Sequence, residues 1–353
     1  MSNYIIQISP EYPPNSGGVG HYACRLANFL RKKSILSKFL ISDLSKIKLS
    51  KQEYFGSKSS DLLALLEKYN SKEIILHYSG YGYSSKGLCF DLISSLEKWK
   101  MKNKNNILIT IFHEIYATGP IYKTSFWTSI PQKYLAKNLL ELTDFAITTT
   151  KKNQMLLSSF NKKKLIKCLH VFSTIGEKTV QKKINKRKKM AVIFGGNYQK
   201  KVLYKNIYIN SHQYADQLKK LGITKIVDVG PKLKNLKKIV NIPIKQLGIK
   251  SNNFISNLLC NSRAGLVYYP ACDMGKSSIV AAYTSHGVLI INFCKDGILK
   301  SNEFISGRHF VSNSSNGLNN FNKIVNSVYK LYKQNNVAKL GSLIICFLKM
   351  KRK

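Results

Sequence analysis

Short apolar segments rich in β-branched residues alternate with amphipathic segments along nearly the whole chain, and this alternation limits the fold more than any other feature of the sequence. The spacing of the apolar residues predicts strands over residues 4–9, 39–42, 73–78, 107–113 and 144–149, and helices over residues 21–32, 91–99 and 132–142. Strands that are separated by helices form a parallel sheet covered by helices on both faces. The first half of the chain therefore predicts an α/β domain.

A polar, basic segment without hydrophobic periodicity, residues 176–189, interrupts the alternation, and the pattern then begins again. Strands are expected over residues 190–194, 225–229, 265–269 and 288–292, and helices over residues 204–218, 253–260 and 277–285. A chain of 353 residues suits two domains. We expect an N-terminal Rossmann-like domain over residues 1–176, a basic linker over residues 177–189 and a C-terminal Rossmann-like domain over residues 190–353. Two doubly wound domains of this kind would face a cleft, because such sheets bind ligands at the carboxyl ends of their strands.

The charge of the chain is strongly positive, with 57 Lys+Arg against 17 Asp+Glu and a formal net charge of +40. Only 6 of these cations are arginines, the residue best suited to reading bases through paired hydrogen bonds, so no specific nucleic-acid partner is expected. The first interpretation is a solvated coat of lysines. An anionic membrane surface or an anionic lipid-linked acceptor comes next, and nucleic acid third. The lysine runs at residues 162–164 and 182–189 would be the contacts.

Cysteine spacing and hydropathy bear on where the protein works. The seven cysteines include no C-x-x-C pair, so neither a disulfide framework nor a zinc site is indicated. No apolar run is long enough to span a bilayer, and the first residues read as a strand, not as a signal peptide. We expect a cytoplasmic protein, with the inner face of the membrane as a peripheral site.

A glycine-rich segment lies between the first expected strand and the first expected helix. Gly17, Gly18 and Gly20 let the backbone approach a bulky ligand, and the helix that follows at His21 offers free N–H groups to an anion. Gly18 and Gly20 also match a loose dinucleotide fingerprint, for which Asp43 would bind the ribose. The glycines come about nine residues after the strand, however, whereas that fingerprint needs a tight turn. A purely structural glycine turn stays open as well.

Two further expected strands of the first half end in residues that suit a sugar or base. Tyr81 and Tyr83 stand on a glycine-rich segment after residues 73–78, where aromatic rings can stack on a ligand, unless the segment is an ordinary surface loop. His113 and Glu114 end the next strand, and either could transfer a proton. Adjacent residues at a strand end point in different directions, so one of the two is expected to face the ligand. The alternative for His113 is a hydrogen-bonded residue at a strand end.

Two segments of the second half could hold a diphosphate. The strand at residues 190–194 ends in two glycines followed by lysines, and a later loop places a lysine and two serines at the start of a helix, a combination that suits a phosphate or a sugar hydroxyl. The donor-site candidates are Gly195, Gly196, Lys201, Asp273, Gly275, Lys276, Ser277 and Ser278. The string Gly275-Lys276-Ser277 is not a Walker A loop, because the position of its first glycine is Pro270. The alternative for the serines is helix capping.

In order along the chain, these motifs resemble the GT-B glycosyltransferases of the large retaining group, which use nucleotide-sugar donors. The segments HYSGYGYSSKG, FHEIYATGPIYKTSFW, HVFSTIGE and KSSIVAAYTSHG are similar to bacterial, especially cyanobacterial, glycosyltransferases of polysaccharide assembly. One departure concerns the two glutamates that the large group places eight positions apart near its last helix. Alignment on His286 and Gly287 puts Met274 and Ala282 at those positions, so donor binding must differ in detail.

The resemblance implies a hexosyltransferase-type enzyme that moves a sugar from a nucleotide-sugar to a glycan or lipid-linked acceptor in cell-surface polysaccharide synthesis. It implies that His113, with Glu114 beside it, lies near the transferred sugar, that Gly18 and Gly20 approach the donor phosphates or the acceptor, and that Lys201 and residues 276–278 contact the diphosphate or sugar. It also implies that no cofactor and no tightly bound metal are needed, and the sequence shows no clustered acidic ligands. The alternatives are a nicotinamide-dependent enzyme and an inactive protein that binds sugar nucleotides.

Overall fold

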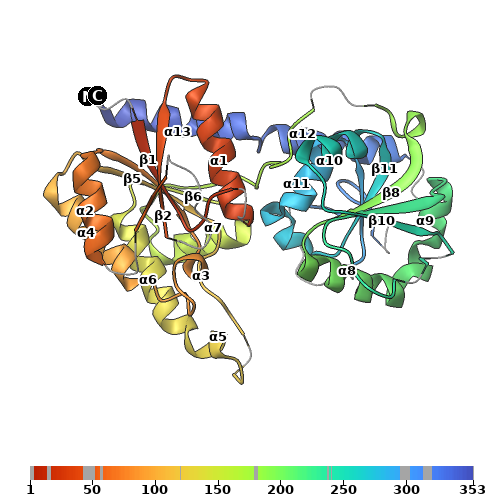
Figure 1. Cartoon of the computed structure of the whole chain (residues 1–353), viewed down its shortest axis with the longest axis horizontal. Helices are drawn as coiled ribbons and strands as arrows, with labels where there is room; N and C mark the ends of the chain where they lie inside the picture. The colour runs from red at the N-terminus through yellow and green to blue at the C-terminus, as the bar shows by residue number, and fades with distance from the viewer. Residues whose placement is uncertain are drawn as a thin grey trace. The chain divides into compact units, whose positions relative to one another are not determined.

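A computed structural model of the chain describes residues 4–13, 17–42, 52–55, 59–119, 121–178, 182–236, 238–239, 241–294, 303–312 and 320–352. The chain forms two compact units, seen in Figure 1. Unit 1 comprises Met1–Leu169 together with Val337–Lys353, and unit 2 comprises His170–Asn336.

Unit 1 is built on a seven-stranded sheet in the order β3-β2-β1-β4-β5-β6-β7, in which every pairing is parallel. The strands are β1 (Tyr4–Ser9), β2 (Leu36–Ile41), β3 (Gln52–Tyr54), β4 (Glu73–Tyr78), β5 (Ile107–Phe112), β6 (Phe145–Thr148) and β7 (Ile166–Cys168). Every residue of β4 and β5 is buried, as expected for central parallel strands that helices cover on both faces. The strand order reverses between β1 and β4.

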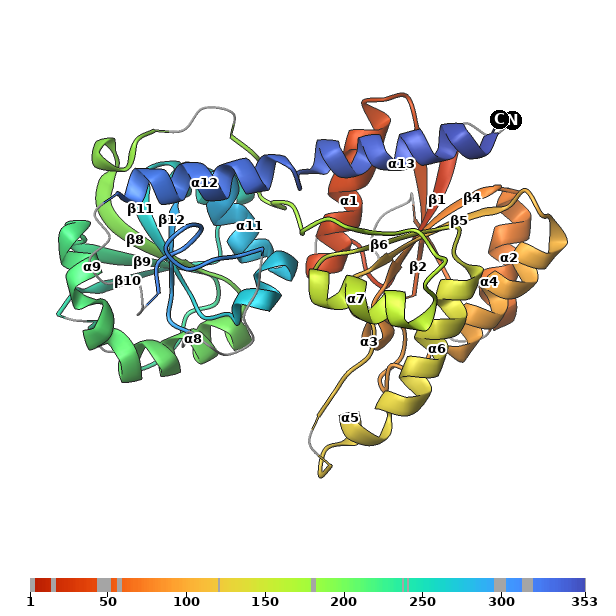
Figure 2. The same cartoon turned by 180° about the vertical axis from the view of Figure 1, so that it is seen from behind.

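The helices of unit 1 pack on both faces of this sheet (Figures 1 and 2). They are α1 (Gly18–Arg31), α2 (Ser59–Tyr69), α3 (Gly80–Tyr83), α4 (Phe90–Lys102), α5 (Thr124–Trp127), α6 (Ser129–Leu142), α7 (Lys151–Phe160) and α13 (Val337–Arg352). The last helix of the chain, α13, packs against α1 and crosses it in both views. Phe347 of α13 stacks on Phe145 of β6 at 4.6 Å, and the Arg352 guanidinium makes two hydrogen bonds, of 2.5 and 2.7 Å, to the Glu73 carboxylate.

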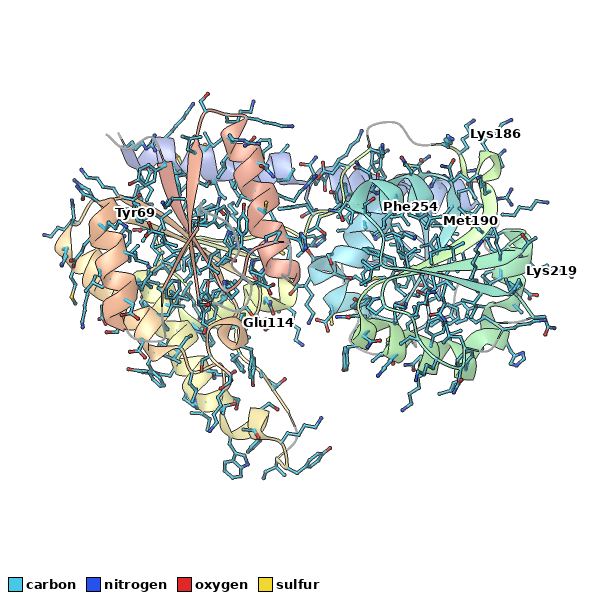
Figure 3. All side chains as sticks on the ribbon, viewed as in Figure 1. Tyr69, Glu114, Lys186, Met190, Lys219 and Phe254 are labelled. Carbon is cyan, nitrogen blue, oxygen red and sulfur yellow. The ribbon has the colours of Figure 1, made fainter. Side chains whose placement is uncertain are left out.

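Unit 2 has a five-stranded parallel sheet in the order β10-β9-β8-β11-β12, which reverses between β8 and β11. The strands are β8 (Lys188–Phe194), β9 (Lys225–Val229), β10 (Ile244–Gly248), β11 (Ser262–Val267) and β12 (Leu289–Asn292). The helices are α8 (Asn197–Asn210), α9 (Ala215–Lys220), α10 (Asn252–Cys260), α11 (Ser278–Ser285) and α12 (Phe321–Lys333), with 3₁₀ turns η2 (Ile184–Lys186), η3 (Ser211–Tyr214) and η4 (Ala271–Lys276). Lysines such as Lys186 and Lys219 project from its surface (Figure 3).

The predicted α/β class and the two doubly wound parallel sheets are confirmed. The extent of the parts differs from the expectation at three places. Residues 170–176, expected in the N-terminal domain, belong to unit 2. Residues 182–189 of the expected linker are built into unit 2, since Arg187 is buried and donates to the carbonyls of Ser262 and His286. The expected second domain ran to residue 353, whereas Val337–Lys353 belongs to unit 1. Within the described residues, no helix combines the length and the apolar character that crossing a bilayer requires.

Candidate functional site

In each unit the residues singled out from the sequence follow strands at or next to the point where the strand order reverses. Ligands of open α/β sheets bind at such points, outside the carboxyl ends of the strands. In unit 1 these segments follow β1, β4 and β5, and in unit 2 they follow β8 and β11. The two sets are described separately.

His113 directly follows β5 and joins the buried His77 and Gln7 in a chain of polar groups that crosses the sheet of unit 1. Its Nε2 lies 3.3 Å from Nδ1 of His77, and Nε2 of His77 lies 2.9 Å from Oε1 of Gln7. The Gln7 amide nitrogen donates to the Ser37 hydroxyl at 2.8 Å, so its oxygen is the group that faces His77. His77 must then carry its proton on Nε2 and accept from His113 through Nδ1. This arrangement leaves Nδ1 of His113 as a hydrogen-bond acceptor.

Both imidazoles are neutral near pH 7. Burial lowers the pKa of His113 to about 4, and burial together with the neighbouring His113 lowers the pKa of His77 well below its ordinary value of 6.5. The ring of Tyr22 from α1 meets the His113 ring edge-on at 4.8 Å and an interplanar angle of 88°, which fixes the plane of the imidazole. His113 is therefore suited to accept a hydrogen bond from a substrate hydroxyl and not to act as a cation.

Glu114 and His113 differ in exposure, as expected for neighbours at a strand end. Glu114 is exposed (Figure 3), and its Oε2 accepts a hydrogen bond of 2.9 Å from the buried Ser79 hydroxyl directly after β4. His113 is half-buried. The Glu114 carboxylate is thus held at the edge of the sheet by a group that follows the neighbouring strand. Ser79 was not singled out from the sequence.

The glycine-rich segment after β1 leads directly into α1. A Cβ at Gly17 would lie 2.7 Å from Oε1 of Glu11, the end of a flexible side chain, while a Cβ at Gly18 would meet open space. The first turn of α1 contains no acidic residue, and its N-cap makes no side-chain hydrogen bond. The N–H groups and the positive dipole end of this first turn suit an anion, and the Glu11 carboxylate lies beside Gly17 at the same end. Gly20 is buried and His21 half-buried, and Asp43, the ribose candidate of the dinucleotide interpretation, lies outside the described residues.

The two tyrosines that follow β4 lie in different surroundings. The Tyr83 hydroxyl donates to the carbonyl of His77 at 2.9 Å and lies 3.3 Å from that of Ile8, so it ties the ends of β4 and β1 together. Burial raises its pKa well above the ordinary value. Tyr81 is exposed. Of the two, Tyr81 has a ring face available for stacking on a ligand.

In unit 2 the two predicted donor segments meet. A Cβ at Gly195, just after β8, would lie 2.8 Å from Cδ1 of Ile279 in the first turn of α11. A Cβ at Gly230, which follows β9 with a φ of +123°, would lie within 2.2 Å of the Gly195 carbonyl oxygen. Both glycines are therefore required for three chain segments to converge at one edge of the sheet, where the exposed Gly196 is also found.

The two lysines of α8 have different environments. Lys200 is buried with its ammonium 2.5 Å from Oδ1 of Asp228 and donates to the carbonyl of Pro231 at 2.6 Å. The other carboxylate oxygen of Asp228 accepts from the Tyr204 hydroxyl at 2.7 Å. The charge of Lys200 is thus neutralised inside the unit, while Lys201 is exposed. Asp228, a single acid in an apolar strand, was not singled out from the sequence.

The loop after β11 forms η4 and then α11. The Ser277 side chain caps α11 by accepting from the Val280 N–H at 3.3 Å, and Ser278 is the first helical residue. Lys276 is exposed, with its ammonium 3.1 Å from Oδ1 of Asp273. The Gly275 carbonyl accepts from the Val171 N–H at 2.8 Å. Lys276 is therefore exposed and Ser278 half-buried, whereas Ser277 and Gly275 have structural partners.

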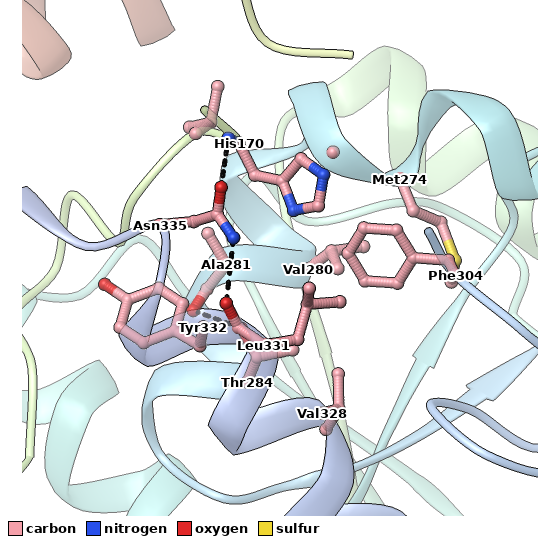
Figure 4. A pocket seen from close by; sticks show the side chains of 12 residues that line it. His170, Met274, Val280, Ala281, Thr284, Phe304, Val328, Leu331, Tyr332 and Asn335 are labelled. Atoms are coloured by element: carbon pink, nitrogen blue, oxygen red, sulfur yellow. Dashed lines mark hydrogen bonds between the residues drawn. The ribbon is translucent and has the colours of Figure 1, made fainter. Parts of the chain in front are cut away.

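Behind this loop lies a small, mostly apolar pocket within unit 2, shown in Figure 4. Met274, Gly275 and residues of α11 and α12 line it together with His170 and Asn335. Oδ1 of Asn335 accepts from the His170 N–H at 2.9 Å, and Nδ2 of Asn335 donates to the carbonyl of Leu331 at 2.8 Å. The polar groups of its wall, including the side chains of His170 and Tyr332, thus have hydrogen-bond partners within unit 2, and the pocket backs the donor segment without presenting a set of groups for a nucleotide.

Comparison with known structures finds chains of similar fold over nearly their full length. An alpha-glucosyltransferase in complex with UDP matches with a TM-score of 0.60 at 9% identity, over 99% of each chain. The same kind of enzyme in complex with UDP and a 13-mer DNA containing an HMU base matches with a TM-score of 0.59 at 11% identity, over 99% of each chain. An α,α-trehalose 6-phosphate synthase from Burkholderia multivorans matches with a TM-score of 0.62 at 10% identity, again over 99% of each chain.

These likenesses give the chain the GT-B fold. No protein-family model matches the sequence, and no curated protein matches it either.

Proposed function

We propose that the protein is a glycosyltransferase that transfers a sugar from a UDP-sugar to an acceptor hydroxyl. The observation that carries the proposal is the likeness over nearly the full length of the chain to several enzymes crystallised with UDP or a UDP-sugar, combined with candidate ligand groups at the reversal point of both sheets. Either domain alone would be compatible with many functions.

The donor is assigned to unit 2. The backbone around Gly195 and Gly196 and the start of α11 at Ser278 would approach the diphosphate, and the exposed Lys201 and Lys276 would neutralise it. Stabilising the charge that develops on the departing diphosphate is the main task of such a site. The two glutamates that the resemblance calls for are absent, so cations and backbone groups would hold the donor.

The acceptor side is assigned to unit 1. His113, neutral and offering Nδ1 as an acceptor, would bind a hydroxyl of the transferred sugar, and Glu114 would accept a proton or a hydrogen bond beside it. The first turn of α1 and Tyr81 would contact the donor phosphates or the acceptor. His77 and Gln7 would act as positioning residues, because they fix the tautomer of His113 without touching the substrate.

The acceptor is proposed to be a glycan, free or lipid-linked, as the resemblance to polysaccharide-assembly enzymes implies. DNA is the second candidate, because the net charge of +40 suits a polyanion and one of the matched enzymes was crystallised with DNA. An acceptor screen that compares oligosaccharides, lipid-linked sugars and DNA, with release of UDP as the readout, separates the two. If no acceptor leads to release of UDP, and the donor is not hydrolysed either, an inactive binding protein would be favoured.

The donor is tested by thermal unfolding with a panel of nucleotides. UDP should raise the melting temperature, because a ligand at about 100 times its Kd stabilises the folded state by about 2.7 kcal/mol. Stabilisation by GDP instead would mean that the donor sugar is linked to guanosine diphosphate. NAD and NADP should leave the melting temperature unchanged. Stabilisation by the nicotinamide dinucleotides alone would replace the proposal with a nicotinamide-dependent enzyme.

A further inference from the structure

A projecting segment of unit 1, residues 121–134, displays an unusual amount of apolar surface. It contains α5 and the start of α6 and extends away from the sheet (Figures 1 and 2). In the described part of the chain, 18 large hydrophobic residues are exposed, and six of them fall within these 14 residues. The six and their exposed fractions are Ile121 (63%), Tyr122 (81%), Phe126 (38%), Trp127 (66%), Ile130 (77%) and Tyr134 (60%). Single exposed hydrophobic residues are ordinary, but a contiguous group indicates an interaction surface.

Hydrogen bonds and a ring contact hold the segment in a defined conformation. The Trp127 indole N–H donates to the carbonyl of Ile121 at 3.0 Å, and its ring meets the Phe126 ring edge-on at 5.4 Å. At the base, the buried Gln132 donates to the carbonyl of Lys86 at 2.7 Å and accepts from the N–H of Ala117 at 2.8 Å. The scaffold thus holds the apolar side chains outward instead of folding them onto the core.

The charges of the same segment favour an anionic partner. The sequence contains no acidic residue between Glu114 and Glu141, while Lys123 and Lys133 of the segment, and Lys137 in the next turn of α6, are exposed. Tryptophan and tyrosine concentrate at the interface between water and lipid, and lysine stems can extend so that their ammonium groups stay among the headgroups. Burial of Ile121 and Ile130 among acyl chains would be favourable, whereas contact with the phosphates of a nucleic acid would not bury their apolar surface.

We propose that residues 121–134 insert into the headgroup region of an anionic membrane and attach the protein to it peripherally. The apolar side chains would enter the boundary of the acyl chains, and the three lysines would pair with anionic headgroups. The inference does not depend on the proposed sugar transfer. It assigns membrane contact to residues 121–134, and not to the basic runs at residues 162–164 and 182–189, which could supply long-range attraction only.

The chain provides its own reporter for the test. The whole sequence contains 2 tryptophans, and Trp99 is buried, so a change in fluorescence on binding comes from Trp127. Vesicles of phosphatidylcholine with about a third phosphatidylglycerol should shift the emission to the blue at low salt, and lipids brominated near the headgroup should quench it. Vesicles of phosphatidylcholine alone should bind at least tenfold more weakly. The variant Trp127→Phe should lose the signal and confirm its origin.

The variants separate insertion from attraction by the lysine coat. Ile121→Ser combined with Ile130→Ser should weaken sedimentation with the anionic vesicles at least tenfold, while Ile249→Ser, which removes an isoleucine of similar exposure from unit 2, should not. Melting curves check that each variant folds. Vesicle binding without a blue shift, or unchanged binding by the double variant, would overturn the proposal. A stronger Trp127 response to duplex DNA than to vesicles would overturn it in favour of a nucleic-acid surface.

Discussion

Single polar residues within otherwise apolar strands organise both candidate sites. Gln7 in β1 and His77 in β4 orient His113, and Asp228 in β9 neutralises Lys200. Burying a polar or charged group is costly unless a partner satisfies it, so these groups are held in one arrangement. In unit 2 the ammonium of Lys200 is therefore buried and paired, and cannot contact a ligand. The exposed cations of the donor segments, Lys201 and Lys276, can do so.

The residue on which the donor assignment can be tested most directly is Lys276. Removing a charge-assisted hydrogen bond to phosphate costs about 1.5–3 kcal/mol, so Lys276→Ala should weaken UDP binding roughly ten- to a hundredfold in calorimetric titration. Lys276→Arg need not restore it, because the two cations differ in shape. The matched control is Lys219→Ala, which removes an exposed lysine of α9. Equal UDP affinity for Lys276→Ala and the wild type would mean that Lys276 is only part of the solvated coat.

At the scale of elements, local pattern predicts what forms but not where it packs. The central strands and α1, α4 and α6 follow from runs and spacings of apolar residues, and were expected near their observed bounds. The helix expected over residues 204–218 is instead α8, η3 and α9, which begin earlier and break at Asn210. The sequence did not predict that the basic tail from Cys346 belongs to a helix that packs on unit 1. The contact between Arg352 and Glu73 joins residues hundreds of positions apart, and no local pattern indicates it.

The candidate sites divide in the same way. The glycines after β1 and β8 and the His113–Glu114 pair could be found from the sequence, because they directly follow recognisable strands. His77 and Gln7 could not be paired, since 70 positions separate them and the sheet alone brings them together. A histidine and a glutamine that interrupt apolar strands were the available signal.

Helix α13 is expected to stabilise unit 1 through a close contact with α1. A Cβ at Gly341 would lie 2.2 Å from Cδ1 of Phe29, so Gly341→Leu forces the two helices apart and should destabilise unit 1 by about 1–3 kcal/mol. Both tryptophans belong to unit 1, so urea unfolding followed by tryptophan fluorescence reports on this unit alone. Lys349→Ala, at an exposed position of the same helix, should leave the urea midpoint in place. A midpoint unaffected by Gly341→Leu would show that α13 is not docked in solution.

For the molecule as a whole, a large positive charge surrounds two cores that each contain neutral imidazoles. Burial lowers the pKa of His77 and His113 in unit 1 and of His286 and His309 in unit 2. The sequence shows the charge of +40 but not which histidines are buried. Lowering the pH therefore destabilises both units through protonation of histidines. It also adds positive charge to a chain whose charges already repel one another.

The last prediction concerns stability against pH. The unfolded chain takes up protons on these histidines as the pH falls through 6.5, whereas His113, His286 and His309 in the folded chain take them up only near pH 4. Above about pH 6.5 these histidines are neutral in both states and do not make stability depend on pH. As the pH falls from about 6.5 to 4, the unfolded chain binds more protons than the folded chain, so the free energy of unfolding decreases progressively. His286 is 1% exposed, and its pKa of about 4 corresponds to at most about 3 kcal/mol.

Urea unfolding at constant, moderate salt, followed by circular dichroism between pH 7.5 and 4.5, should thus show midpoints that fall with pH. His286→Gln should make the decline for unit 2 shallower, because glutamine has no proton to take up, while the fluorescence transition of unit 1 keeps its slope. The His286 ring lies 2.8 Å from both the Ser256 hydroxyl and the Ala282 carbonyl oxygen, so the variant is expected to lose some stability at every pH. It is the slope against pH, not the offset, that tests the buried neutral imidazole. A wild-type midpoint that stays constant from pH 7 to 5 would contradict the burial of these groups as neutral species.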